Sequence, residues 1–132
     1  MKKAALLFFS IIFITSYGIS HSIADKFLSV KELKALFSGV TIETVTNNRY
    51  ANPVEIKFSA DGTYVMSIDG SRGYREREGK WWTVAPDKFC RQNDKGTSRT
   101  KHCFRFKKVG SKYINFNPSE NKESYPSWTF TQ

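Results

Sequence analysis

The stretch "VEIKFSADGTYVMSIDG", residues 54–70, decides the fold class. Its first five residues alternate between apolar and charged side chains, which is the pattern of a strand with one buried face. Asp61-Gly62 then supplies a preferred two-residue hairpin turn. Beyond the turn the alternation resumes, with the inner face continued by Tyr64, Met66 and Ile68. The stretch therefore predicts an antiparallel hairpin.

The same signals recur along the rest of the chain. Short alternating segments bounded by turn residues are predicted over residues 40–46, 74–84, 89–92, 103–108, 112–117 and 128–130. Strands at this spacing, without helices between them, favour an antiparallel fold over a parallel sheet. We therefore predict a mainly β protein, a small antiparallel β-barrel or sandwich of about eight strands.

One short helix is predicted ahead of the strands. Ser29 and Glu32 fit a capping box, and Gly39 is a natural residue to follow the last turn. The apolar residues between them recur at steps of three and four, at Val30, Leu33, Phe37 and Val40. A helix of this length is marginal alone, so we expect it to dock on the strands, where it could plug an open barrel end.

The first 24 residues have the pattern of a secretory signal peptide. Two lysines at positions 2 and 3 precede an apolar run over 4–14, and small residues stand before a cleavage point after Ala24, with Ser20 as the alternative. The run is too short to span a bilayer as a helix. We expect a single exported domain over residues 25–132, periplasmic or secreted.

The two cysteines, Cys90 and Cys103, are expected to pair, because an exported chain meets an oxidising environment. Their spacing excludes a CxxC redox motif. Together with His102, the one histidine after the predicted signal, they supply only three zinc ligands, so we predict no metal site and no cofactor.

Two adjacent tryptophans precede the first cysteine. On a strand Trp81 and Trp82 point to opposite faces, so one belongs to the core and the other faces outward. A bulge near Gly79 would exchange their roles, and the sequence leaves both assignments open.

Four motifs in order, "LKALFSGVTIE", "FSADGTYV", "GKWWTV" and "FCRQ…HCFRF", resemble small exported bacterial β-proteins grouped as domains of unknown function. Such proteins share a helix ending in Ser-Gly-x-Thr, an Ala-Asp-Gly-Thr turn, a Gly-x-Trp strand and a cysteine pair. The resemblance implies export and fold. The Gly79-Lys80-Trp81 step is also similar to the Gly-x-Trp of lipocalins, which seals a barrel end, although this chain is shorter and carries the step mid-chain.

Positive charge is concentrated around the cysteine hairpin. Nine lysines and arginines lie between residues 88 and 112, opposed by Asp94 alone. Such a localised field can steer an anionic partner. The cations that we assign to this role are Arg91, Lys95, Arg99, Lys101, Arg105, Lys107, Lys108 and Lys112. Expected partners are an acidic protein, an anionic envelope polymer or lipid headgroups; nucleic acid fits the charge, but an exported protein seldom meets it.

Catalytic signatures are missing from the sequence. It contains no HExxH or GxSxG motif. Asp61, Asp69 and Asp87 are expected to bond local amides in turns, and charge patterning on an exposed strand explains the alternation of Arg75 to Glu78. We therefore predict that the protein is not an enzyme.

Two binding functions follow. In the first, the basic disulfide-closed hairpin meets an anionic partner. In the second, a lipocalin-like carrier holds a small apolar ligand in a barrel lined by Tyr64, Met66, Trp82, Phe104 and Phe116, with Trp81 as a further candidate. An eight-stranded barrel is mostly filled by its own side chains, which argues against a large cavity. A lysozyme-inhibitor-like role ranks lowest, since the surface charge has the wrong sign for a basic enzyme.

Overall fold

The computed structural model describes residues 26–95, 100–119, 122–124 and 126–131. The predicted signal segment lies outside these ranges. Within them the elements follow the order α1 (Val30–Phe37), β1 (Thr41–Val45), β2 (Pro53–Phe58), β3 (Thr63–Gly70), β4 (Gly73–Val84), β5 (Lys88–Asn93), β6 (His102–Val109), β7 (Lys112–Phe116) and β8 (Thr129–Thr131). The predicted fold class, mainly β with one short N-terminal helix, is confirmed.

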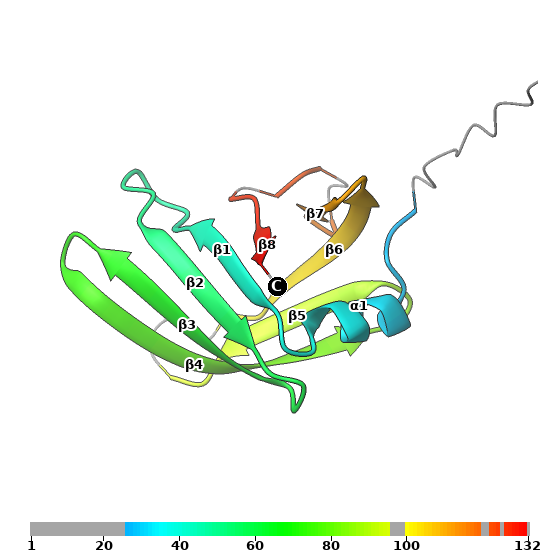
Figure 1. Ribbon diagram of the computed structural model, residues 1–132, viewed down its shortest axis with the longest axis horizontal. Helices are drawn as coiled ribbons and strands as arrows, with labels where there is room; N and C mark the ends of the chain where they lie inside the picture. The colour runs from blue at the N-terminus through cyan, green and yellow to red at the C-terminus, as the bar shows by residue number, and fades with distance from the viewer. Residues whose placement is uncertain (1–25, 96–99, 120–121, 125, 132) are drawn as a thin grey trace, which may run out of the picture.

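The strands form a single antiparallel sheet in the order β7-β6-β5-β4-β3-β2-β1-β8. Neighbours from β1 to β7 are also consecutive in sequence, whereas β8 returns to pair with β1. β7 and β8 approach each other at the two ends of this order, where the rings of Tyr113 and Phe130 lie 5.0 Å apart. The sheet therefore curls into a nearly closed barrel (Figure 1).

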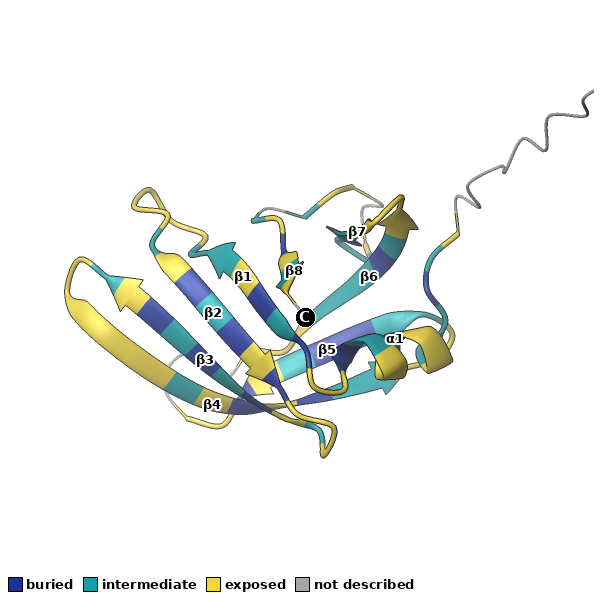
Figure 2. Ribbon diagram, in the orientation of Figure 1, coloured by how far each residue is buried: buried dark blue, intermediate teal, exposed yellow. Residues whose placement is uncertain are grey.

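The hairpin of residues 54–70 forms as its sequence predicts. Asp61 accepts hydrogen bonds from the amide and the hydroxyl of Thr63, which close the turn. On β2 and β3 every second residue is buried, and Figure 2 shows the resulting alternation along both strands. The buried set faces the barrel interior and consists of Val54, Ile56, Phe58, Tyr64, Met66 and Ile68.

Helix α1 closes one end of the barrel. The predicted capping box is present, with the Ser29 hydroxyl and the Glu32 carboxylate each accepting a backbone amide of the other residue. Gly39 follows the helix with φ +93°, as expected for a residue at that position. Within the described ranges α1 is the only helix, and it falls far short of the length and apolarity that crossing a bilayer requires.

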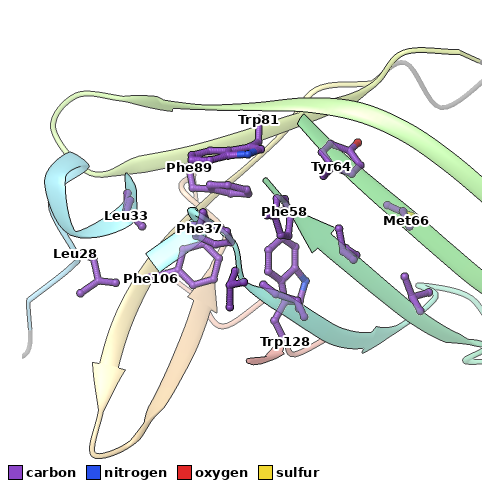
Figure 3. Packing of buried hydrophobic residues seen from close by; sticks show 14 of the residues in the cluster. Leu28, Leu33, Phe37, Phe58, Tyr64, Met66, Trp81, Phe89, Phe106 and Trp128 are labelled. Atoms are coloured by element: carbon purple, nitrogen blue, oxygen red, sulfur yellow. The ribbon is translucent and has the colours of Figure 1, made fainter. Parts of the chain in front are cut away.

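Phe37, at the last position of α1, is the centre of the core. Its side chain is fully buried and stacks on Phe89, with ring centroids 3.8 Å apart. Five further rings surround it within 6.3 Å, as Figure 3 shows for most of them: Phe58, Trp81, Phe106, Trp128 and Phe130. The helix thus inserts an aromatic plug that fills this half of the barrel.

The tryptophan pair is resolved by the strand register. Trp81 is the buried one, and its indole Nε1 donates a hydrogen bond of 2.9 Å to the carbonyl oxygen of Ser59. Trp82 is half-buried on the outer face, directly beside Cys90 in the β4–β5 pairing. Gly79 has the same strand parity as Trp81 and also faces the interior. A Cβ at Gly79 would collide with the Tyr64 phenol ring, so only glycine fits at this position. The two tryptophans therefore serve opposite faces of the same wall.

Two predictions for other side chains are wrong. Phe116 does not face the interior; the preceding residue, Asn115, is buried there at 1% exposure, because β7 carries apolar residues on both faces and Phe116 packs edge-on against Phe27. The Asp87 carboxylate bonds Arg105 instead of the local turn amides. It accepts hydrogen bonds from Nε and a terminal nitrogen of Arg105, at 3.1 and 2.6 Å.

Candidate functional site

The barrel is hollow at the end away from α1. β1 starts close to the helix (Figure 1). Its other end borders a cavity of about 640 Å³. The cavity is bounded by the far ends of β1, β2 and β3, by β5 and the start of β6, and by the segment between β7 and β8. The aromatic core fills one half of the barrel, and this cavity occupies the other.

One wall of the cavity is apolar. It consists of two directly paired sets on β2 and β3, Val54 with Ile68 and Ile56 with Met66. All four are buried, and they face inward because their period of two matches the strand pleat. Their apolar surface lines a space that opens to the outside.

The opposite wall is aromatic and comes from distant parts of the sequence. Phe104 on β6 lies 4.9 Å from the indole of Trp128, measured between ring centroids. Trp128 in turn packs against Phe58 in the core. A ligand in the cavity would therefore contact apolar side chains on both sides.

Arg91 is the one charged residue that β5 turns into the barrel. It has the same strand parity as the buried Phe89 and pairs in register with Trp81 on β4 and with His102 on β6. Its guanidinium carbon lies 5.8 Å from the ring centroids of both Tyr64 and Trp128. Burial lowers the pKa of Arg91, but an arginine stays protonated in proteins. A permanent cation thus lines the cavity.

Arg91 lacks an acidic partner in the part of the chain that the structure describes. The ion pairs there join Lys57 to Glu55 and Arg105 to Asp87. The Nε of Arg91 is buried without a hydrogen-bond acceptor. A half-buried charge without an opposite charge beside it is costly, so a site of this kind favours an anion.

The rim adds further polar groups. Lys101, His102, Lys122 and Glu123 stand around the opening. Burial, and then the neighbouring charge of Arg91, lower the pKa of His102. His102 is therefore held toward its neutral form. The charged residues that line the cavity are two lysines, one arginine and one glutamate, so positive charge is in excess.

Tyr64 lies below the cavity instead of lining it. Its hydroxyl donates a hydrogen bond of 2.6 Å to Oδ1 of the buried Asn93. Burial raises the pKa of Tyr64. Of the predicted ligand or core residues, Met66 and Phe104 line the cavity, Tyr64 and Trp81 belong to the core, and Trp82 and Phe116 lie on the outer face.

The predicted cations do not share one surface. Arg91 is inside the barrel and Lys101 is at its rim. Arg105 and Lys107 project from the outer face of β6 around the ring of Phe27, at 3.5 and 4.7 Å from its centroid. The others are dispersed or undescribed: Lys108 lies 5.7 Å from the Tyr113 ring, Lys95 and Lys112 are exposed, and Arg99 lies outside the described residues.

The predicted disulfide Cys90–Cys103 is present. It joins directly opposed residues on the outer face of β5 and β6. The ladder between these strands has three residue pairs, and the crosslink is the middle one, next to the pair of Arg91 with His102. The disulfide therefore fixes the wall that carries the interior cation.

Comparisons with protein-family models, with curated proteins and with solved structures found no match. Sequence reasoning placed Arg91 on the surface of a hairpin, although one signal for its position was present. Its distance of two residues from Phe89 puts both side chains on one face of the strand.

Proposed function

We propose that the protein is an exported binding protein that holds a small, largely apolar molecule in the open end of its barrel. The observation that carries this proposal is the cavity of about 640 Å³, lined by buried aliphatic residues on one side and by Phe104 and Trp128 on the other. Concave, mostly apolar cavities of about 300–1,000 Å³ with a few polar groups are typical of small-molecule sites.

The two halves of the barrel interior are filled differently, which supports this proposal. Phe37 and the rings around it fill the half next to α1, so that half supplies stability. The other half leaves inward-facing Val54, Ile56, Met66 and Ile68 without a layer of side chains above them. A ligand would supply that missing layer.

Export is part of the proposal. The Cys90–Cys103 disulfide is compatible with an oxidising compartment, and the first 24 residues have the pattern of a signal peptide. Binding of an anionic macromolecule by the basic hairpin stays a prediction. It has fewer cations to draw on, because Arg91 faces the interior and Arg105 is paired with Asp87.

The test is to purify the protein natively from its source envelope, extract it and identify retained small molecules by mass spectrometry. A variant with Val54→Trp and Ile68→Trp places two indoles side by side on the cavity wall and should retain none. The matched control is Lys57→Trp with Val65→Trp, the paired positions on the outer face of the same strands. Equal retention by both variants, or no bound molecule and no binding of any apolar compound offered, would contradict the proposal.

A further inference from the structure

The cavity has a chemical asymmetry that restricts which apolar molecules it can hold. Its aliphatic wall on β2 and β3 faces a wall that carries one guanidinium group, from Arg91. The apolar surface selects for a hydrocarbon body, whereas the cation selects for the charge on the rest of the molecule.

The position of Arg91 is set by the surrounding residues and not by a flexible loop. It stands on β5 between Trp81 and His102, next to the disulfide that joins the two strands. The rings of Tyr64 and Trp128 lie at equal distances of 5.8 Å from its guanidinium carbon. Ring faces attract a cation, and the Tyr64 hydroxyl is also a hydrogen-bond partner of the guanidinium, but one hydroxyl cannot satisfy all the N–H donors of an arginine.

Arg91 therefore keeps unsatisfied hydrogen-bonding capacity beside the cavity that it lines. Its Nε has no acceptor, and none of the carboxylates in the described ranges pairs with it. A guanidinium binds a carboxylate through two parallel hydrogen bonds, which makes such pairs stronger than neutral contacts. Burial away from water increases the strength of that pair.

We propose that the ligand is an amphipathic monocarboxylate, a fatty-acid-like molecule whose carboxylate pairs with Arg91 and whose hydrocarbon body lies against Val54, Ile56, Met66 and Ile68. This inference rests on the proposed function, since it names the ligand class of the same cavity. Lys101 and Lys122 at the rim add a positive field that favours entry of an anion.

The rim also contains a group that opposes an anion. Glu123 lines the opening together with Lys122 and His102. It stands at the rim with two lysines, whereas Arg91 is on the wall. The preference for a carboxylate should therefore depend mainly on Arg91 and only weakly on the rim.

The experiment compares three ten-carbon probes by isothermal titration calorimetry at low ionic strength: decanoate, 1-decanol and decyltrimethylammonium. Decanoate should bind the native protein about 10- to 100-fold more tightly than 1-decanol, as expected for a charge-assisted pair, and decyltrimethylammonium should bind most weakly. Arg91→Met should abolish the difference between decanoate and 1-decanol and leave 1-decanol binding intact. Lys112→Gln removes an exposed cation away from the cavity and should change neither the affinity for decanoate nor the affinity for 1-decanol.

The outcomes separate the two proposals. If 1-decanol and decanoate bind equally in the cavity, the carboxylate inference is wrong and the apolar site remains. If none of the three probes binds, both proposals are contradicted for this ligand size and class. If the Arg91→Met variant still binds decanoate more tightly than 1-decanol, other groups cause the preference and the proposed role of Arg91 is wrong.

Folding of the variant is checked with the same samples. Removing a half-buried cation that lacks an acidic partner should leave the urea midpoint of the free protein unchanged or higher. Decanoate should raise the midpoint of the native protein and not that of Arg91→Met, because only a ligand bound to the folded state stabilises it. An equal rise in both proteins would also contradict the inference.

Discussion

Replacing Phe37 by alanine tests whether the helix holds the barrel together. The ring is fully buried and lies within 6.3 Å of six aromatic rings, measured between centroids. Phe→Ala in a core costs about 3–5 kcal/mol, and the cost is highest where neighbours cannot move into the space. The neighbours here are large rings held on five different strands and on the residue just before β8, so we expect about 4–5 kcal/mol. That is a large fraction of the stability of about 5–15 kcal/mol typical of a domain.

The assay is equilibrium urea unfolding with the disulfide intact, followed by tryptophan fluorescence and by far-ultraviolet circular dichroism. Leu36→Ala is the matched control, because Leu36 is the preceding residue on α1 and only half-buried against the core. It should lose about 1 kcal/mol. If Phe37→Ala loses no more than Leu36→Ala, the helix is not the plug of this barrel end and the reasoning fails.

Three further predictions concern stability. Replacing both Cys90 and Cys103 by alanine should cost about 3 kcal/mol, from the loop-closure entropy of a crosslink with a sequence separation of 13; a loss below 1 kcal/mol in urea unfolding would contradict this account. Gly79→Ala should cost about 1–3 kcal/mol, because the new methyl group would collide with the Tyr64 ring and a backbone carbonyl; an unchanged urea midpoint would show that the close approach is not needed. Hydrogen bonds from the Ser29 amide and hydroxyl lower the pKa of Glu32. The stability they provide is present above the unfolded pKa and lost as pH falls through the lower folded one, so Glu32→Gln should be less stable than the native protein at pH 7 and approach it in acid; a gap that stays constant down to pH 2 would refute this.

Local sequence patterns predict most of the fold. The alternation and the Asp-Gly turn of residues 54–70 specify both the hairpin and its inner face, because one buried face leaves a single acceptable register. The capping box at Ser29 and Glu32 likewise marks the helix start. In both cases the physical cause lies within a few residues, so the sequence contains it.

The errors arose where a side chain depends on residues far away in the sequence. β7 has apolar residues on both faces, and only its contacts with Phe27 and Phe130 decide that Tyr113 and Asn115 face inward. Asp87 pairs with a residue 18 positions away. Local alternation cannot report such long-range choices.

The candidate site was the least predictable part. Period-two alternation predicts that the residues of its aliphatic wall face inward, but not that the space above them is empty. Arg91 was grouped with surface cations because charge usually indicates exposure. Its parity with Phe89 pointed inward, and the structure places it there, half-buried and without an acidic partner in the described ranges.

The most direct test of the proposed ligand site is a titration with decanoate followed by methyl nuclear magnetic resonance. Methyl signals of Val54, Ile56 and Ile68 inside the cavity should shift and saturate at one ligand per protein. The methyl signals of Val65, which lies on the outer face of β3, should stay unchanged. Shifts at Val65 without shifts at the three interior residues would place binding on the outer surface and contradict the account.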